Sequence, residues 1–379
     1  MPMNDAALPA TNNRRQTSTS SHILTLDAAR GLAALFVMIY HLDPFLSFRP
    51  YFSRSYLAVD LFFLMSGFVV AKAYEFKLTS GSMRLFDFCK VRLIRLYPLY
   101  AMGLAIGLAY LAGKALAGRE ITAPESQIWF SAALSALFLP QFSSYHDLNN
   151  LCPFDPAAWS LSLEALINLI YAIWLYKLSA RSLLVIVALS AVLLVYLTAH
   201  HGSIDLGWNV QTALGGLTRV IFSFTLGVVL FRWQPAFDLP LGRVHPVILL
   251  TALAIALVMP IPGSWMYYDL AVVFGLFPLF TLLARHSPVH PSQVPFFSMS
   301  GRLSYAIYIL HSPVIMWTTG MCKDIFAADP KQHVPLFGIV TFGIIVLISY
   351  IAAIHIDEPL RKTWFAPQRG NGEVLLRKL

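Results

Sequence analysis

Apolar runs of bilayer-spanning length recur along almost the whole chain, and they limit the folds that it can adopt. A transmembrane helix needs about 20 consecutive, mainly apolar residues. Ten such runs lie near residues 24–42, 56–74, 97–113, 157–177, 181–199, 213–232, 245–259, 266–284, 300–320 and 336–356. The pattern predicts an all-α integral membrane protein with about ten transmembrane helices.

The composition supports this prediction and excludes two other classes of protein. Of the 379 residues, 57% are hydrophobic and 12% are charged, and the mean hydropathy is +0.65. A soluble domain carries about 25% charged residues, and a disordered chain needs low hydrophobicity. The net charge of +8 therefore concerns membrane orientation, and we expect the lipid bilayer, not nucleic acid, as the partner.

An eleventh apolar run, 127–140, is short and bounded by Pro124 and Pro140, so we expect a re-entrant or interfacial helix there. If the other ten runs span, most of the 27 Lys and Arg residues fall on the side that holds both termini. Cytoplasmic loops carry this excess of positive charge. The prediction is a multi-pass protein of the inner (cytoplasmic) membrane with both termini in the cytoplasm.

Three regions follow from this layout. Residues 1–21 are polar and lack the apolar core of a signal peptide, which indicates a disordered cytoplasmic tail. Residues 22–360 form the transmembrane domain, and 361–379 form a second cytoplasmic tail. The three cysteines lack metal-ligand spacing, so no metal is expected. They fit buried small side chains, although Cys152 and Cys322 would share the outer side and a disulfide between them stays open.

The first span holds two ionisable residues, Arg30 and His41, eleven residues apart. That spacing corresponds to three helical turns, so both side chains share one face at about 16 Å along the axis. Ionisable groups inside a membrane are costly and are candidates for function. The alternative is an Arg that reaches the headgroups from the helix end and a His at the interface.

Further polar residues interrupt the second and fourth spans. Asp60 lies at the outer end of the second span and could pair with a neighbouring His. Ser66 and Gly67 lie in its middle, where small residues often serve close helix packing. Ser160 and Glu164 share a face of the fourth span, and a carboxylate at that depth needs a partner or a wet cavity.

Three arginines suggest contacts with anions. Arg92 and Arg95 share a helix face in a basic stretch beside the membrane. They fit either a cytoplasmic phosphate site or charge that only sets topology. Arg219 lies on the outer side of the sixth span, where it could pair with a carboxylate or contact an anionic group.

The ninth span carries a polar stripe on an otherwise apolar helix. Ser304, Tyr308 and His311 are spaced by four and three residues, which places them on one side. Pro313 follows, and a kink there would help to open a cavity. A single Tyr or His would fit an interface anchor, but the three together favour a functional site.

Taken in order, these elements resemble the acyltransferase 3 family of membrane proteins, over about Leu26 to Leu360. The matching motifs are Arg30 and His41 separated by ten residues, Ser66-Gly67-Phe68, Arg92 and Arg95 as RxxR, Trp159, Ser160, Ser162 and Glu164 as WSLSxE, Ser304, Tyr305, Tyr308 and His311 on the ninth span, and Glu358-Pro359. The fused soluble hydrolase-like domain of some members is absent from this sequence.

The resemblance implies an O-acyltransferase with an acyl-CoA donor, usually acetyl-CoA, and a hydroxyl acceptor on a glycan, glycolipid or natural product. It implies His41 as the catalytic residue and Arg30, Arg92 and Arg95 as donor-binding groups. We expect Asp60 or Glu164 to orient His41, and His311 with Tyr308 to line the cavity and stabilise the oxyanion.

The remaining motif residues are expected at the substrates. Ser66 and Gly67 are assigned to the donor, and Trp159, Ser160, Ser304, Tyr305 and Arg219 to the acceptor. The alternative function is a proton-coupled transporter or flippase of an anionic glycan, lipid or drug, which also needs intramembrane Arg, His and Glu.

Overall fold

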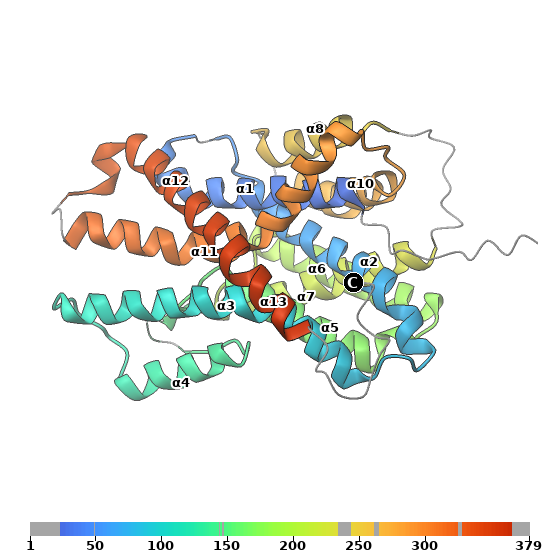
Figure 1. Ribbon diagram of the computed structural model, residues 1–379, viewed down its shortest axis with the longest axis horizontal. Coiled ribbons are helices and arrows are strands. Elements are labelled where there is room, and N and C mark those ends of the chain that lie inside the picture. Colours follow the sequence, from blue (N-terminus) through green and yellow to red (C-terminus); the bar gives the residue numbers. More distant parts are fainter. Residues whose placement is uncertain are drawn as a thin grey trace, which may run out of the picture.

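The computed structural model describes residues 23–365 apart from 49, 144, 146–147, 234–243, 261–264 and 325–327. In this part of the chain the regular structure is helical, without a β-strand, and the long helices run side by side (Figure 1). The α-helices are α1 Leu24–Leu46, α2 Ala58–Thr79, α3 Leu85–Leu116, α4 Glu125–Ala136, α5 Ala158–Ile173, α6 Ala180–His201, α7 Ala213–Arg232, α8 Pro246–Val258, α9 Trp265–Ala271, α10 Phe277–Ala284, α11 Val294–Asp324, α12 Leu336–Ile351 and α13 Glu358–Phe365.

The predicted all-α membrane protein is confirmed, and the count of ten spans is approximate. Among the described residues, seven helical segments are long and apolar enough to cross a bilayer: Leu24–Leu46, Ser55–Thr79, Leu85–Leu116, Ala180–His201, Val210–Arg232, Trp265–Ala284 and Leu336–Trp364. Two of these contain a π-helical turn, which joins α9 to α10 and α12 to α13. The apolar helices α5 and α8 are shorter, and α11 is 31 residues long.

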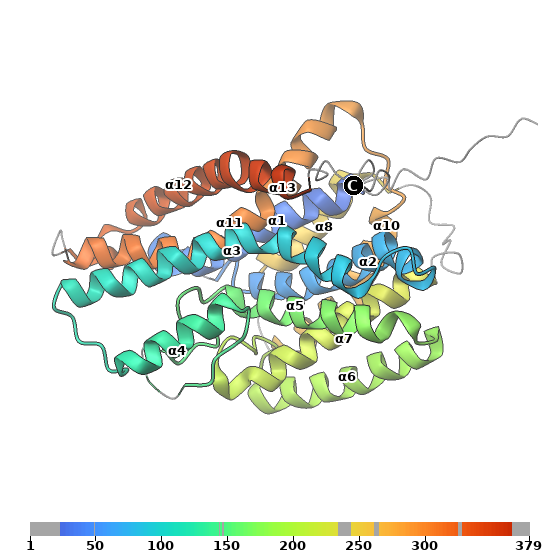
Figure 2. The same ribbon diagram turned by 60° about the horizontal axis from the view of Figure 1, so that its bottom comes forward.

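The eleventh apolar run forms the short helix α4. Its 12 residues rise about 18 Å, which is less than the roughly 30 Å of a hydrocarbon core. Figure 2 shows α4 at the edge of the bundle, next to α3. Trp129 and Phe130 on this helix are 65% and 58% exposed, and exposed aromatic residues of this kind are typical of a membrane interface.

The helices α2 and α7 pack closely through glycines. A Cβ atom on Gly67 would lie 2.0 Å from the carbonyl oxygen of Phe224, and one on Gly227 would lie 2.1 Å from that of Leu64. No side chain fits at either position, so each glycine brings its helix against the backbone of the other. Gly67 therefore serves helix packing, the alternative open from the sequence.

Two helix ends differ from the sequence-based layout. The helix α3 begins at Leu85, twelve residues before the predicted span, so Arg92 and Arg95 lie inside a helix. The helix α13 continues to Phe365, past the predicted end of the membrane domain at 360. The predicted tails lie outside the described residues, except for 361–365.

The cysteines are all free. Cys152 is buried with its Sγ 3.5 Å from Ser162 Oγ, and Cys322 lies against the carbonyl oxygen of Ala328. The disulfide left open from the sequence is therefore not formed.

Candidate active site

Two histidines from opposite ends of the sequence meet between α1 and α11. The ring centroids of His41 and His311 are 4.9 Å apart, and Nε2 of His311 lies 3.3 Å from Nδ1 of His41. His311 is completely buried, whereas His41 is exposed. Of the pair, only His41 therefore presents surface to a substrate.

Toward the other end of α1, a carboxylate is surrounded by cationic side chains. Oε1 of Glu164 accepts hydrogen bonds from Ser66 Oγ at 2.6 Å and from Arg92 at 3.2 Å. Arg30 interacts electrostatically with Arg92, Arg95 and Glu164, and also with Asp27. These three guanidinium groups outnumber the two carboxylates, Glu164 and Asp27, so the cluster carries an excess of positive charge, which favours an anionic ligand.

A hydrogen bond between two further polar residues lies between the arginine cluster and the histidine pair. Ser160 Oγ and the Tyr308 hydroxyl are 2.7 Å apart. Ser160 lies one helical turn from Glu164 on α5, and Tyr308 lies one turn from His311 on α11. Polar side chains from α5 and α11 thus extend from the guanidinium groups to His41.

Members of this set also retain accessible surface. Arg30, Ser66, Glu164 and Tyr305 are partly exposed, and His41 is exposed. They come from α1, α2, α5 and α11, and the pairs α1–α2, α1–α11 and α2–α5 are in contact. The arrangement can admit a ligand that contacts several helices at once.

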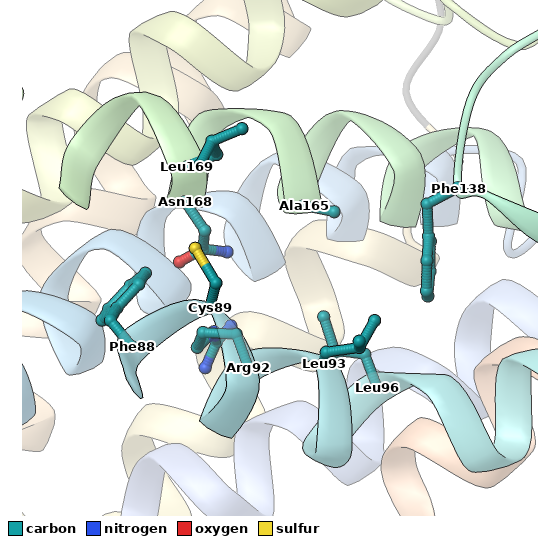
Figure 3. Close-up of a pocket in the computed structure, with 9 residues that line it drawn as sticks. All are labelled: Phe88, Cys89, Arg92, Leu93, Leu96, Phe138, Ala165, Asn168 and Leu169. Atoms are coloured by element: carbon teal, nitrogen blue, oxygen red, sulfur yellow. The ribbon is translucent and has the colours of Figure 1, made fainter. Parts of the chain in front are cut away.

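A hollow of about 140 Å³ lies beside the arginine cluster, between α3 and α5 (Figure 3). Its walls are almost entirely apolar, and Arg92 and Asn168 contribute the polar side chains. Leu93 and Leu169, which also line it, are 51% and 40% exposed. This hollow brings Arg92 to the wall of an apolar space at the side of the bundle.

Asp60 pairs with Arg219 and with neither histidine among the described contacts. Their closest atoms are 2.8 Å apart, and both side chains are completely buried. Arg219 also donates to the carbonyl oxygens of Leu206 and Tyr56. Since its three nitrogens are all engaged, Arg219 fits the structural pairing that the sequence left open, and the carboxylate of Asp60 is used in the same contact.

Other predicted residues contact the protein itself. Ser304 donates to the Gly301 carbonyl and Tyr305 to the Leu96 carbonyl, so these hydroxyls join α11 to itself and to α3. Trp159 packs edge-on to Phe63, and the guanidinium of Arg219 lies 5.5 Å from its ring centroid.

Sequence reasoning missed Tyr40 and Asp205. The Tyr40 hydroxyl donates to Asp205 at 3.1 Å, and the Tyr40 ring stands edge-on to His41 with 5.1 Å between centroids. Tyr40 directly precedes His41, so its nearness was available from the sequence. Asp205 lies in the loop between α6 and α7 and carries no such signal.

It also missed a buried cluster on the same side as His41. Arg54 contacts Asp269 at 3.4 Å, the Tyr56 hydroxyl donates to that carboxylate at 2.7 Å, and Arg54 lies 3.9 Å over the Trp265 ring.

The described residues include no group of three His, Cys, Asp or Glu side chains that could hold a metal ion.

Comparison with known proteins identifies the family. A model of the acyltransferase domain family, acyltransferase 3, matches residues 23–354. Protein 2 in the picA locus of Rhizobium radiobacter is 35% identical over 190 residues, which are 48% of this chain and 98% of that protein. No solved structure matches.

Two longer relatives come from Staphylococcus aureus. A putative O-acetyltransferase of strain COL is 24% identical over 377 residues, and the O-acetyltransferase OatA of strain NCTC 8325 is 24% identical over 372. Each alignment covers 90% of this chain but only 58% and 57% of the relative. The chain thus spans a little over half the length of these two proteins. Since the family match covers nearly all of the described residues, this chain belongs to the acyltransferase 3 family of membrane acyltransferases.

Proposed function

We propose that this protein transfers an acyl group, most simply acetyl, from cytoplasmic acyl-CoA to a hydroxyl group of a glycan, glycolipid or natural product. The observation that carries the proposal is the placement of two different chemistries on one set of packed helices. Arginines gather around Glu164 at one end, and an exposed histidine lies about 16 Å along α1 from Arg30. The names of the Staphylococcus aureus relatives support acetyl as the group and a hydroxyl as the acceptor.

At the donor end, Arg30 and Arg95 would contact the phosphates of CoA. Guanidinium groups suit phosphate geometry, and both side chains keep accessible surface. Arg92 is buried and tied to Glu164, so its part is to hold the cluster together. The extended pantetheine arm would then carry the thioester along α1 toward His41.

At the acceptor end, Nε2 of His41 would remove the proton from the acceptor hydroxyl as its oxygen attacks the thioester carbonyl. The C–S bond breaks, and the CoA thiolate accepts that proton from the imidazolium. In the alternative sequence, Nε2 attacks the thioester first, the C–S bond breaks and CoA leaves as the thiolate. The acceptor hydroxyl then displaces the acyl group from the cationic ring, and its proton converts the thiolate to the CoA thiol. Both sequences need an accessible, unprotonated Nε2.

The orientation expected from the sequence is part of the proposal. With both termini in the cytoplasm, α1 runs outward, so the arginine cluster faces the cytoplasmic acyl-CoA and His41 lies toward the outer face of the inner membrane. The acceptor would then be modified on the outer side, as a cell-surface glycan requires.

The test is an acetyl-transfer assay on the purified full chain in lipid nanodiscs. With radiolabelled acetyl-CoA and a glycan extract as acceptor, we expect label in the glycan and release of CoA thiol. His41→Ala should lower the rate at least about 100-fold, the usual contribution of a general base. His200→Ala is the matched control, because His200 is exposed on α6.

Two outcomes would contradict the proposal. A folded His41→Ala protein with the wild-type rate would remove His41 from the chemistry. In vesicles that contain the protein in their membrane, uptake of glycan without release of CoA thiol would favour the transporter that the sequence left open.

A further inference from the structure

His311 has no accessible surface, yet it touches the proposed catalytic histidine. Its side chain is completely buried on α11, and its Nδ1 lies 2.7 Å from the Tyr308 carbonyl oxygen and 3.2 Å from that of Ile307. A carbonyl oxygen only accepts hydrogen bonds, so Nδ1 carries the hydrogen. In the neutral ring Nε2 is then an acceptor.

The same reasoning fixes the tautomer of His41. Its Nδ1 lies 2.9 Å from the Val37 carbonyl oxygen, so this nitrogen also carries a hydrogen. Nε2 of His311 lies 3.3 Å from Nδ1 of His41. The hydrogen on Nδ1 can therefore be shared between two acceptors, the Val37 carbonyl oxygen and Nε2 of His311. Ser312 Oγ, at 3.3 Å, can donate to the same Nε2. The nitrogen of His41 left without hydrogen is Nε2.

We propose that His311 is a positioning residue that acts through His41. It holds the Nδ1–H tautomer and the ring orientation of His41, so that the basic Nε2 faces the substrates. This inference rests on the proposed function, and it replaces the expected role of His311 as an oxyanion stabiliser. A completely buried ring cannot contact the acyl group or the acceptor.

The hydrogen bond gains strength during the reaction. When Nε2 of His41 takes the hydroxyl proton or the acyl group, the ring becomes cationic, and its Nδ1–H then donates to His311 as a charge-assisted hydrogen bond. His311 itself neither gains nor loses a proton, because its Nδ1–H remains hydrogen-bonded to the Tyr308 carbonyl oxygen. A buried neutral imidazole thereby stabilises a charge that exists only after the reaction has begun, which raises kcat and not affinity.

The experiment compares His311→Leu, His311→Gln and His311→Asn with the wild type in the acetyl-transfer assay. Loss of a hydrogen bond to a charged group should lower kcat about 10- to 100-fold in the Leu variant, with both KM values almost unchanged. Gln keeps an acceptor oxygen near the place of Nε2 and should restore most of kcat. Asn, a polar residue whose oxygen lies near the place of Nδ1, should not.

Two further measurements separate positioning from a structural role. In the His41→Ala background, His311→Leu should cause no further loss, because residues that act through one another are not additive. Diethyl pyrocarbonate attacks the unprotonated nitrogen of an imidazole. In the Leu variant, Nε2 of His41 is no longer held in this basic form facing the substrates. The labelling of His41, followed by mass spectrometry, should therefore be slower than in the wild type. This readout needs no remaining activity.

Several results would overturn the inference. They are a Gln variant no better than Asn, a change in KM in place of kcat, additive losses in the double variant, or unchanged labelling of His41. If His41→Ala is inactive while His311→Leu works at the wild-type rate, only the role of His311 fails. If His41→Ala is fully active, the proposed function fails first.

Discussion

At the scale of single residues, the buried charges fall into two kinds. Asp60 and Arg219 are completely buried, and the nitrogens of Arg219 donate hydrogen bonds to Asp60 and to two carbonyl oxygens. Glu164 keeps 18% of its side chain accessible, pairs with Arg92 and interacts electrostatically with Arg30, which we assign to the donor. Enclosure thus separates charges that hold helices together from charges that can meet a ligand.

This difference predicts the cost of breaking the enclosed pair. Asp60→Asn leaves the guanidinium of Arg219 buried without its counter-charge, so we expect a loss of about 3–5 kcal/mol in the free energy of unfolding. Equilibrium unfolding in detergent measures it. The matched control is Asp324→Asn, which removes an ion pair with the 55%-exposed Arg119 and should cost under about 1 kcal/mol.

A combined variant checks the cause of that loss. Replacing both partners, in Asp60→Asn with Arg219→Met, removes the unpaired charge and should recover part of the stability. If the single and the double variants are equally unstable, the loss comes from packing at this position and not from the isolated charge.

The sequence predicted which residues share a helix face, but not their partners across helices. Arg30 with His41 and Tyr308 with His311 follow from helical spacing alone. The contact of His41 with His311 joins residues 270 apart in the chain, and that of Arg219 with Asp60 joins residues 159 apart. Such pairs depend on how helices are arranged around one another, which local periodicity does not encode.

At the scale of elements, close approach of helices explains why a motif residue can be structural. Gly67 belongs to the SGF motif and was assigned to the donor from the sequence, yet its Cα faces the backbone of α7. Ser66, one residue earlier, points instead to Glu164. Within one motif, one residue thus contacts the site and its neighbour sets the distance between α2 and α7.

Gly67→Ala tests this division. The added Cβ would lie 2.0 Å from the Phe224 carbonyl oxygen, so α2 and α7 must move apart, and we expect a loss of about 1–3 kcal/mol in stability. Gly343→Ala on α12 is the control, because nothing lies within 4 Å of its Cβ position. It should be neutral or stabilising by up to about 1 kcal/mol, since alanine favours a helix. Equal melting temperatures of the two variants would show that α2 and α7 separate without cost.

The span pattern predicted the helices better than their ends. Hydropathy marks where a helix leaves the apolar region, not where its backbone stops being helical. The helix α3 begins at Leu85, outside the apolar run at 97–113, and the carboxylate of Asp87 in its first turn accepts a hydrogen bond from the backbone N–H of Arg84. The arginines of the RxxR motif therefore lie on a continuous helix that leads into the bundle.

At the scale of the whole molecule, α4 decides the side on which everything after it lies. If α4 does not cross, the segments on either side of it share one face of the membrane. α5 then runs inward beside α3, as placing Glu164 near Arg92 requires. If α4 crossed, the later helices would be inverted relative to the basic loops, against the positive-inside rule.

Single cysteines introduced into a cysteine-free protein test this topology in intact cells. With the N-terminus in the cytoplasm, a membrane-impermeant maleimide should label Ala117→Cys, after α3, and Asn149→Cys, after α4. It should label Ser80→Cys, between α2 and α3, only after the cells are opened. All three positions are exposed, so access depends on the membrane and not on burial. Labelling of Ala117→Cys but not of Asn149→Cys in intact cells would mean that α4 spans. Labelling of Ser80→Cys alone would place the arginine cluster outside, away from the cytoplasmic donor that we propose.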